Sequence, residues 1–99
     1  MIQPKSIADV MGGTAILGSR VLSIGDLEKS ISLGLPKRAL RYTVERVYQT
    51  VGDIRREMFC IVPEATFKRR TRLSPAESER TERLARVIAT RTEINVLGS

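Results

Sequence analysis

Residues 50–75 read TVGDIRREMFCIVPEATFKRRTRLSP, and this stretch decides the fold that we expect. The polar residues near its start, Thr50 and Asp53, can each cap a short amphipathic helix, because their side chains accept hydrogen bonds from a first helical turn. After a turn, Pro63 begins a basic segment that we expect to form a second helix. Two short helices joined by a tight turn form a helix-turn-helix, which we place at about residues 50–72.

The second of these helices carries its cations in a helical pattern. In a helix that starts at Pro63, polar and basic residues three and four positions apart share a face, and a second basic row lies beside it. Two such rows fit the phosphates on either side of a DNA groove, whereas a protein partner is the alternative. Phe67 is expected to anchor the helix to the core. The candidate DNA-binding residues of this helix are Thr66, Lys68, Arg69, Arg70 and Arg72.

Basic residues outside this helix extend the same cluster. Between Lys37 and Arg72 the sequence has ten basic and four acidic residues, and this local excess equals the net charge of +6 of the whole chain. Concentrated positive charge favours nucleic acid as a partner, with a merely solvated surface as the alternative. The candidates for flanking DNA contacts are Lys37, Arg38, Arg41, Arg55 and Arg56.

Further helices are indicated before this cluster. Asp26 is expected to cap a helix that ends at Gly34, and Pro36 suits the first position of the next helix. The strand-like segment 20–24 has no partner of similar strength, so we interpret it as an extended connector and expect an all-α fold. The helix after Pro36 is expected to face the core through Leu40, Val44, Val47 and Tyr48.

The C-terminal part begins with a strong helix signal. Residues 74–77, Ser-Pro-Ala-Glu, combine an N-cap, a proline at the first helical position and a glutamate at the third. The helix that follows is expected to project from the bundle and to run to about Asn95, polar all round in its first half and apolar in its second. The candidate partner-interface residues on it are Leu84, Val87, Ile88, Arg91 and Ile94.

The composition argues against an enzyme. The chain has no histidine and one cysteine, and it contains neither a Gly-rich phosphate loop nor a dinucleotide-binding motif, so we expect no catalytic residue, no metal site and no cofactor. Cys60 lies in an apolar run and is expected to be buried. No apolar stretch approaches the ~18 residues of a membrane span, and no signal-peptide pattern is present. These features predict a cytoplasmic protein.

Two segments together resemble a known family. GLPKRALRYTVERV (34–47) and PEATFKRRTRLSPAESERTERLARVIA (63–89), with the spacing between them, resemble the Xre/MbcA/ParS-like antitoxins, and the resemblance covers roughly residues 20–90. It implies a small helical bundle with an Xre-type helix-turn-helix. It also implies a gene beside that of a RES-domain toxin that degrades NAD⁺, and a toxin–antitoxin complex that binds operator DNA and represses its own promoter.

The resemblance divides the chain into two parts. Residues 1–73 are expected to be the DNA-binding and dimerisation domain, and residues 74–99 the start of the toxin-binding region, truncated relative to the family because the sequence ends at INVLGS. We therefore expect an antitoxin that neutralises a RES-type toxin and, as a homodimer, places two basic helices in successive major grooves. The alternative is a protein-interaction scaffold whose helix-turn-helix mediates dimerisation without DNA binding.

Overall fold

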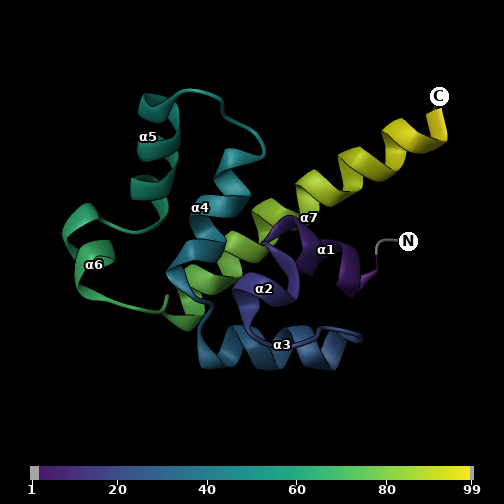
Figure 1. Cartoon of the computed structure of the whole chain (residues 1–99), viewed down its shortest axis with the longest axis horizontal. Coiled ribbons are helices and arrows are strands. Elements are labelled where there is room, and N and C mark those ends of the chain that lie inside the picture. The colour runs from purple at the N-terminus through teal and green to yellow at the C-terminus, as the bar shows by residue number, and fades with distance from the viewer. Residues whose placement is uncertain (1–2, 99) are drawn as a thin grey trace.

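The all-α class is confirmed by the structure, a computed structural model that describes residues 3–98 and the side chains of residues 3–91 (Figure 1). No strand is present within residues 3–98. The helices in chain order are α1 (Pro4–Val10), α2 (Gly13–Leu17), α3 (Ile24–Leu33), α4 (Lys37–Glu45), α5 (Val51–Ile61), α6 (Glu64–Arg69) and α7 (Pro75–Gly98).

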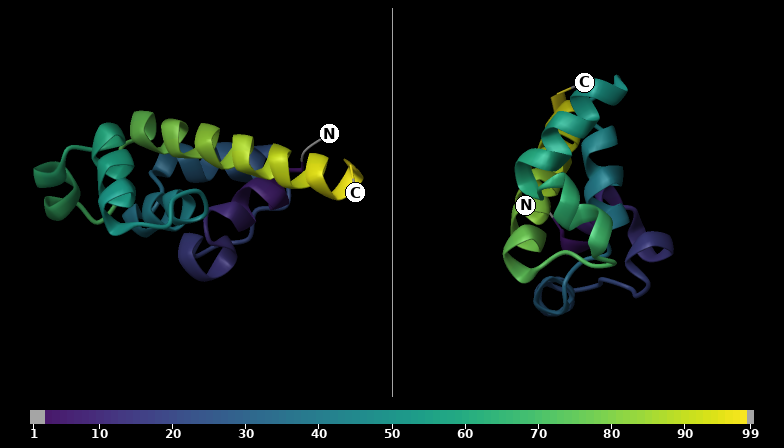
Figure 2. Two further views of the ribbon diagram at one scale, coloured as in Figure 1. Left: turned by 90° about the horizontal axis from the view of Figure 1, so that it is seen from above. Right: turned by 90° about the vertical axis from the view of Figure 1, so that its left-hand side faces the viewer.

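The long helix α7 is the element on which the others pack. It contacts α1, α3, α4 and α5, and its C-terminal turns extend beyond the rest of the molecule (Figures 1 and 2). The first half of α7 is polar, as expected, yet one side of it is buried against the other helices. Small side chains on that side let neighbouring helices approach closely, and within residues 75–91 the buried residues of α7 are Ser78, Thr81, Glu82, Ala85 and Ala89.

Both buried hydroxyl groups within residues 75–91 of α7 have hydrogen-bond partners. Ser78 Oγ accepts a hydrogen bond from the backbone N–H of Leu35 at 2.9 Å, and Thr81 Oγ1 donates one to the carbonyl of Glu77 at 3.0 Å. A buried hydroxyl costs free energy unless it is hydrogen-bonded, so these bonds allow a polar helix face to lie in an aliphatic core.

The core itself is aliphatic, as the scarcity of aromatic residues predicts. Leu40 and Val44 on α4 are fully buried, and Tyr48, which follows the end of α4, is half-buried and packs against the core, as expected. Val47 is 42% exposed and is the one residue of the expected apolar face that lies outside the core. The largest fully buried apolar side chains of the described residues are Met11, Leu35, Leu40, Val44 and Val62.

Two connecting segments pair with each other, and we call this pairing the clasp. Residues 34–37 join α3 to α4, residues 71–73 join α6 to α7, and they run antiparallel with a bridge between Pro36 and Arg72. The two backbone hydrogen bonds of the clasp run from Leu73 N to Leu35 O (2.8 Å) and from Lys37 N to Thr71 O (3.3 Å). The two segments that carry the family resemblance therefore touch each other.

Glycine is required at the first residue of the clasp. Gly34 ends α3 with φ of +90°, a conformation that L side chains rarely adopt. A Cβ atom placed there would lie 2.4 Å from the carbonyl oxygen of Leu73. The expectation that Gly34 terminates α3 is confirmed, and the close approach of the second segment gives it an additional role.

Helix caps follow local sequence rules, with one shift. The hydroxyl of Thr50 accepts from the N–H of Asp53, and Ser74 and Glu77 form the expected reciprocal capping box. The cap of α3 is Ser23 rather than Asp26, because the hydroxyl of Ser23 accepts from the N–H of Asp26 at 3.2 Å. The carboxylate of Asp26 instead accepts from the N–H of Leu22 at 3.1 Å.

Candidate nucleic-acid interface

Helices α5 and α6 form a pair at the end of the molecule that lies away from both chain termini (Figures 1 and 2). Two residues join them. Val62 has an extended conformation and is 1% exposed, so it fixes the turn to the core, and Pro63 caps the start of α6. The sequence-based expectation of two short helices meeting at Pro63 is confirmed.

The aromatic ring of Phe67 holds α6 in place. Its centroid lies 6.0 Å from that of Phe59 on α5 in an edge-to-face arrangement, and both rings pack against the buried core. The ammonium group of Lys37 lies 5.0 Å from the centroid of Phe67 and donates a hydrogen bond to its carbonyl at 3.0 Å. The predicted anchoring role of Phe67 is confirmed, and Lys37 is part of that anchor.

The position of Phe67 decides which side of α6 faces solvent. Successive helical residues are rotated by about 100°, so Ala65 and Arg69 lie nearly opposite Phe67. Both are exposed, as is Lys68 beside them, whereas Thr66 on the other flank is half-buried. The outward centre of α6 is therefore formed by Ala65 and Arg69.

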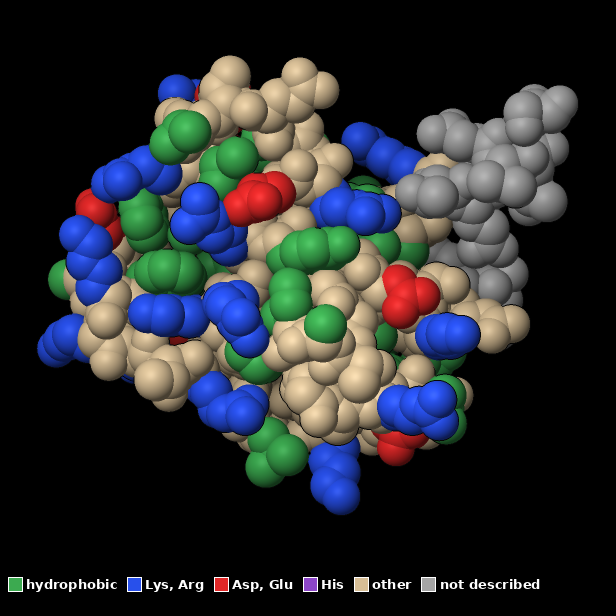
Figure 3. Space-filling view, in the orientation of Figure 1, with side chains coloured by type: hydrophobic (Ala, Val, Ile, Leu, Met, Phe, Trp, Pro, Cys, Tyr) green, Lys and Arg blue, Asp and Glu red, His purple; other side chains and the backbone are tan. Residues whose placement is uncertain are grey.

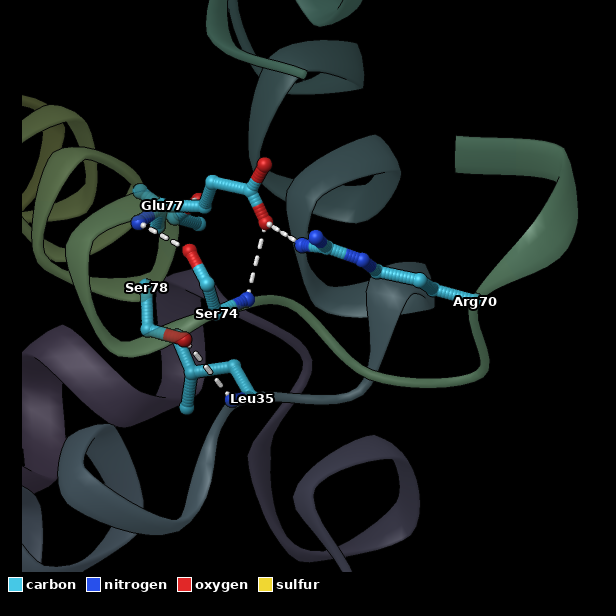
Figure 4. A network of polar contacts seen from close by, with 6 residues as sticks. Leu35, Arg70, Ser74, Glu77 and Ser78 are labelled. Carbon is cyan, nitrogen blue, oxygen red and sulfur yellow. Dashed lines mark hydrogen bonds and ion pairs between the residues drawn. The ribbon is translucent and has the colours of Figure 1, made fainter. Parts of the chain in front are cut away.

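The helix ends three residues earlier than expected, so Arg70 and Arg72 do not continue its faces. Arg70 has an extended backbone, and its guanidinium pairs with the carboxylate of Glu77 at 3.0 Å (Figure 4). Arg72 lies in the clasp and donates to the carbonyl of Gly34 at 2.9 Å. The physical reason is the clasp, because only an extended segment can reach residues 34–37 and then enter the capping box of α7.

Carboxylates neutralise much of the basic cluster. Glu64 accepts a hydrogen bond from Arg55 at 2.9 Å and lies 3.2 Å from the ammonium of Lys68. Besides the pair of Arg70 with Glu77, Arg41 pairs with Glu45 (2.7 Å) and Arg56 with Asp53 (3.7 Å). The pairs of Arg41 and Arg56 are substantially exposed, and exposed ion pairs contribute about 0–1 kcal/mol each, so an approaching phosphate can replace them.

Two of the ten predicted contact residues are cations that have neither an ion pair nor a side-chain hydrogen bond among the described residues. Arg38 at the start of α4 and Arg69 at the end of α6 are exposed, and neither makes an ion pair or side-chain hydrogen bond with the residues that the structure describes. The contact between Lys37 and Phe67 places the start of α4 against α6, so these two regions belong to one surface. Lys and Arg side chains gather on this side of the molecule (Figure 3).

The structure separates the candidate partner-interface residues on α7 into two groups. Leu84 and Ile88 are half-buried and pack against the core of their own chain. Val87 is 50% exposed, and Arg91 is also exposed. Ile94 lies outside the residues whose side chains the structure describes.

Two residues have environments that differ from their sequence interpretation. Cys60 is exposed rather than buried, because it lies about 200° around α5 from the buried Met58. Glu64, which lies outside the predicted set of DNA-contact residues, is the carboxylate that joins α5 to α6. The i,i+4 spacing of Glu64 and Lys68 is the sequence signal that indicates such a pair.

Comparison of the chain with models of protein families, with curated proteins and with solved structures finds no match. Within the described residues, no group of three or more His, Cys, Asp or Glu side chains is placed to hold a metal ion. None of the described helices has the length and apolar character needed to cross a membrane.

Proposed function

We propose that this protein binds duplex DNA through a helix-turn-helix formed by α5 and α6, with α6 entering the major groove and α5 bracing it. The observation that carries this proposal is the outward face of α6. A short helix anchored on one side by Phe67 presents Ala65, Lys68 and Arg69 to solvent at one end of the molecule. A surface helix with so little apolar area contributes little to folding stability, so its basic composition favours an anionic ligand.

The same surface supplies contacts for the DNA backbone. Arg38 and Arg69 have no carboxylate partner among the described residues, so they are ready to bind phosphates. The paired cations Arg41 and Arg56 exchange a weak surface ion pair for a phosphate contact. Each phosphate that the protein neutralises makes the slope of log affinity against log salt more negative by about 0.9. Binding is therefore expected to be strongly salt-dependent.

The biological setting that we propose is that of an antitoxin. The resemblance of residues 34–47 and 63–89 to Xre/MbcA/ParS-like antitoxins supports a cytoplasmic homodimer that represses its own operon and neutralises a RES-domain toxin. The clasp pairs residues from both of these segments, so the two parts of the resemblance lie together in the fold. Val87 and Arg91, which are exposed on α7, are the described candidates for toxin contact.

A second candidate function is a protein-interaction scaffold without DNA binding. One observation favours it, because several of the predicted DNA-contacting cations are already paired. Glu64, Glu45, Asp53 and Glu77 each hold at least one of them. On this hypothesis the basic surface would meet an acidic protein face, and the binding of duplex DNA would be weak at every salt concentration.

Fluorescence anisotropy separates these two functions. Labelled duplexes from the region upstream of the gene, and random duplexes of equal length, are titrated with the full chain at 50–200 mM salt. The DNA-binding proposal predicts that Arg69→Ala and Arg38→Ala each bind DNA more weakly. The slope of their log affinity against log salt should also be shallower than that of the wild type. Lys29→Ala on α3 removes the same charge outside the basic cluster and serves as the matched control. If no duplex binds the full chain detectably at 50 mM salt, the DNA-binding proposal is wrong and the scaffold function is favoured.

A further inference from the structure

The carboxylate of Glu64 occupies an unusual place on the surface proposed to meet DNA. It is the first residue of α6, and its side chain is 43% exposed on the flank next to Lys68. An uncompensated carboxylate there would repel phosphates. Glu64 lies between two cations, so the group of three carries a net positive charge and remains compatible with DNA.

The two cations leave one oxygen of this carboxylate without a partner. The guanidinium of Arg55 donates to Oε1, and the ammonium of Lys68 also lies closest to Oε1. Oε2 accepts no hydrogen bond from any residue that the structure describes. Arg55 is itself held against the ring of Phe59, with its guanidinium carbon 5.5 Å from the ring centroid. The two cations therefore orient the carboxylate of Glu64, and its Oε2 remains able to accept a hydrogen bond.

We infer that Glu64 is a specificity-determining residue that accepts a hydrogen bond from the exocyclic amino group of cytosine in the major groove. The inference rests on the proposed DNA-binding function. Residues at the start of a recognition helix are those that reach base edges, and Glu64 begins α6. The cations that orient Glu64 act as positioning residues.

The chemistry of the base edges selects cytosine over the alternatives. Cytosine presents an amino donor in the major groove, whereas guanine presents two acceptors that repel a carboxylate, and thymine presents an acceptor and a methyl group. Adenine has an amino donor, but its neighbouring N7 is an acceptor. An amide side chain matches this donor and acceptor together, whereas a carboxylate does not. A carboxylate at this position thus rejects guanine and thymine as well as attracting cytosine.

The test compares the base preference of the wild-type chain with that of Glu64→Gln. A random-duplex selection with the full-length protein defines its preferred site, and dissociation constants are then measured for all four bases at each position of that site. We expect one position at which wild type prefers cytosine by about tenfold. Glu64→Gln is expected to lose this preference and to tolerate adenine, because an amide offers both a donor and an acceptor.

Two controls make the result specific. Glu79→Gln removes the charge of an exposed glutamate on α7 that has no ion pair among the described residues, and it should keep the cytosine preference. Glu64→Asp keeps the charge but shortens the side chain, so it should lose the preference while the salt slope is unchanged.

Each outcome is decisive. If Glu64→Gln selects the same bases as wild type and differs only in overall affinity or thermal stability, the carboxylate is a tether between α5 and α6, and the inference is wrong while DNA binding stands. If neither protein binds any duplex at 50 mM salt, the proposed function fails and this inference fails with it.

Discussion

Replacement of Gly34 by alanine tests the clasp directly. The residue has φ of +90° and ψ of 122°, a region that costs a non-glycine residue about 1–3 kcal/mol. The added methyl group would also lie 2.4 Å from the carbonyl oxygen of Leu73, which is backbone and cannot rotate away. Separating the two segments weakens the hydrogen bonds of the clasp, at about 1 kcal/mol each.

Together these contributions give a loss of about 3–5 kcal/mol in the free energy of unfolding. For a domain of this size, 1 kcal/mol corresponds to about 4–8 °C, so we expect the melting temperature of Gly34→Ala to fall by roughly 12–40 °C. The loss is a large part of the ~5–15 kcal/mol that a native domain possesses. The assay is thermal and urea unfolding followed by circular dichroism at 222 nm.

Two other glycines separate the contributions. Gly18 also has positive φ, of +80°, but no atom lies within 4 Å of an added Cβ, so Gly18→Ala should lose only about 1–2 kcal/mol. Gly52 lies in α5 with no atom within 4 Å of its Cβ position, and Gly52→Ala should be neutral or stabilising by up to about 1 kcal/mol. Equal losses for Gly34→Ala and Gly18→Ala would show that the close approach in the clasp does not exist.

Three further predictions concern the core, the anchor and a phenol. Ser78→Ala leaves the buried N–H of Leu35 without an acceptor, so we expect a loss of about 1–3 kcal/mol by urea unfolding, and a loss below 0.5 kcal/mol would contradict the bond. Phe67→Ala frees α6 from α5, and DNA affinity measured by anisotropy should fall about tenfold or more while the other helices remain folded. Burial, and secondarily the nearby carboxylate of Glu57, raise the pKa of Tyr48, so its phenol should ionise above the ordinary value of 10.0. The difference between wild-type and Tyr48→Phe absorbance titrations at 295 nm isolates this phenol, and a midpoint at or below that value would refute the environment described. Because the folded-state pKa is raised, any contribution of Tyr48 to stability is present below pH 10.0 and is lost as pH rises through the folded pKa.

Local interactions are the part of this fold that the sequence predicts well. The cap at Thr50 and the reciprocal pair of Ser74 and Glu77 each depend on two residues three positions apart. Such short-range patterns can be recognised directly in the sequence. The exposure of Cys60 was also predictable from helical rotation relative to Met58. Its apolar neighbours along the chain suggested burial, and that criterion ignores the direction in which a helical side chain points.

Long-range contacts explain what was not predicted. The early end of α6 depends on pairing between segments more than thirty residues apart, and no local signal in the sequence marks it. Ser78 and Thr81 look like surface residues by type, yet both are fully buried because helices pack closely over small side chains. At the candidate site, the positive charge was evident from the sequence, but the distribution of carboxylate partners was not. Arg38 and Arg69 are distinguished from the other cations only by the fold.

Glu77 joins the basic surface to α7 and provides the last prediction. Its Oε1 accepts a hydrogen bond from the backbone N–H of Ser74 at 2.8 Å and one from Arg70 at 3.0 Å (Figure 4). The side chain of Glu77 is only 14% exposed, so this interaction is less screened by solvent than the other ion pairs of the cluster. Glu77→Gln keeps the shape and the acceptor for Ser74 but removes the charge that attracts Arg70.

Two opposite effects should follow from Glu77→Gln. Stability should fall by about 1–2 kcal/mol, because a charge-assisted hydrogen bond becomes a neutral one. Arg70, released from its partner, becomes available to a DNA phosphate, so the slope of log affinity against log salt should steepen by up to about 0.9. A purely structural carboxylate would weaken folding and leave the salt slope unchanged, and Glu79→Gln on the exposed side of α7 should change neither quantity. A steeper salt slope with lower stability would therefore show that Glu77 competes with DNA phosphates for Arg70. An unchanged slope would show that Arg70 does not contact DNA.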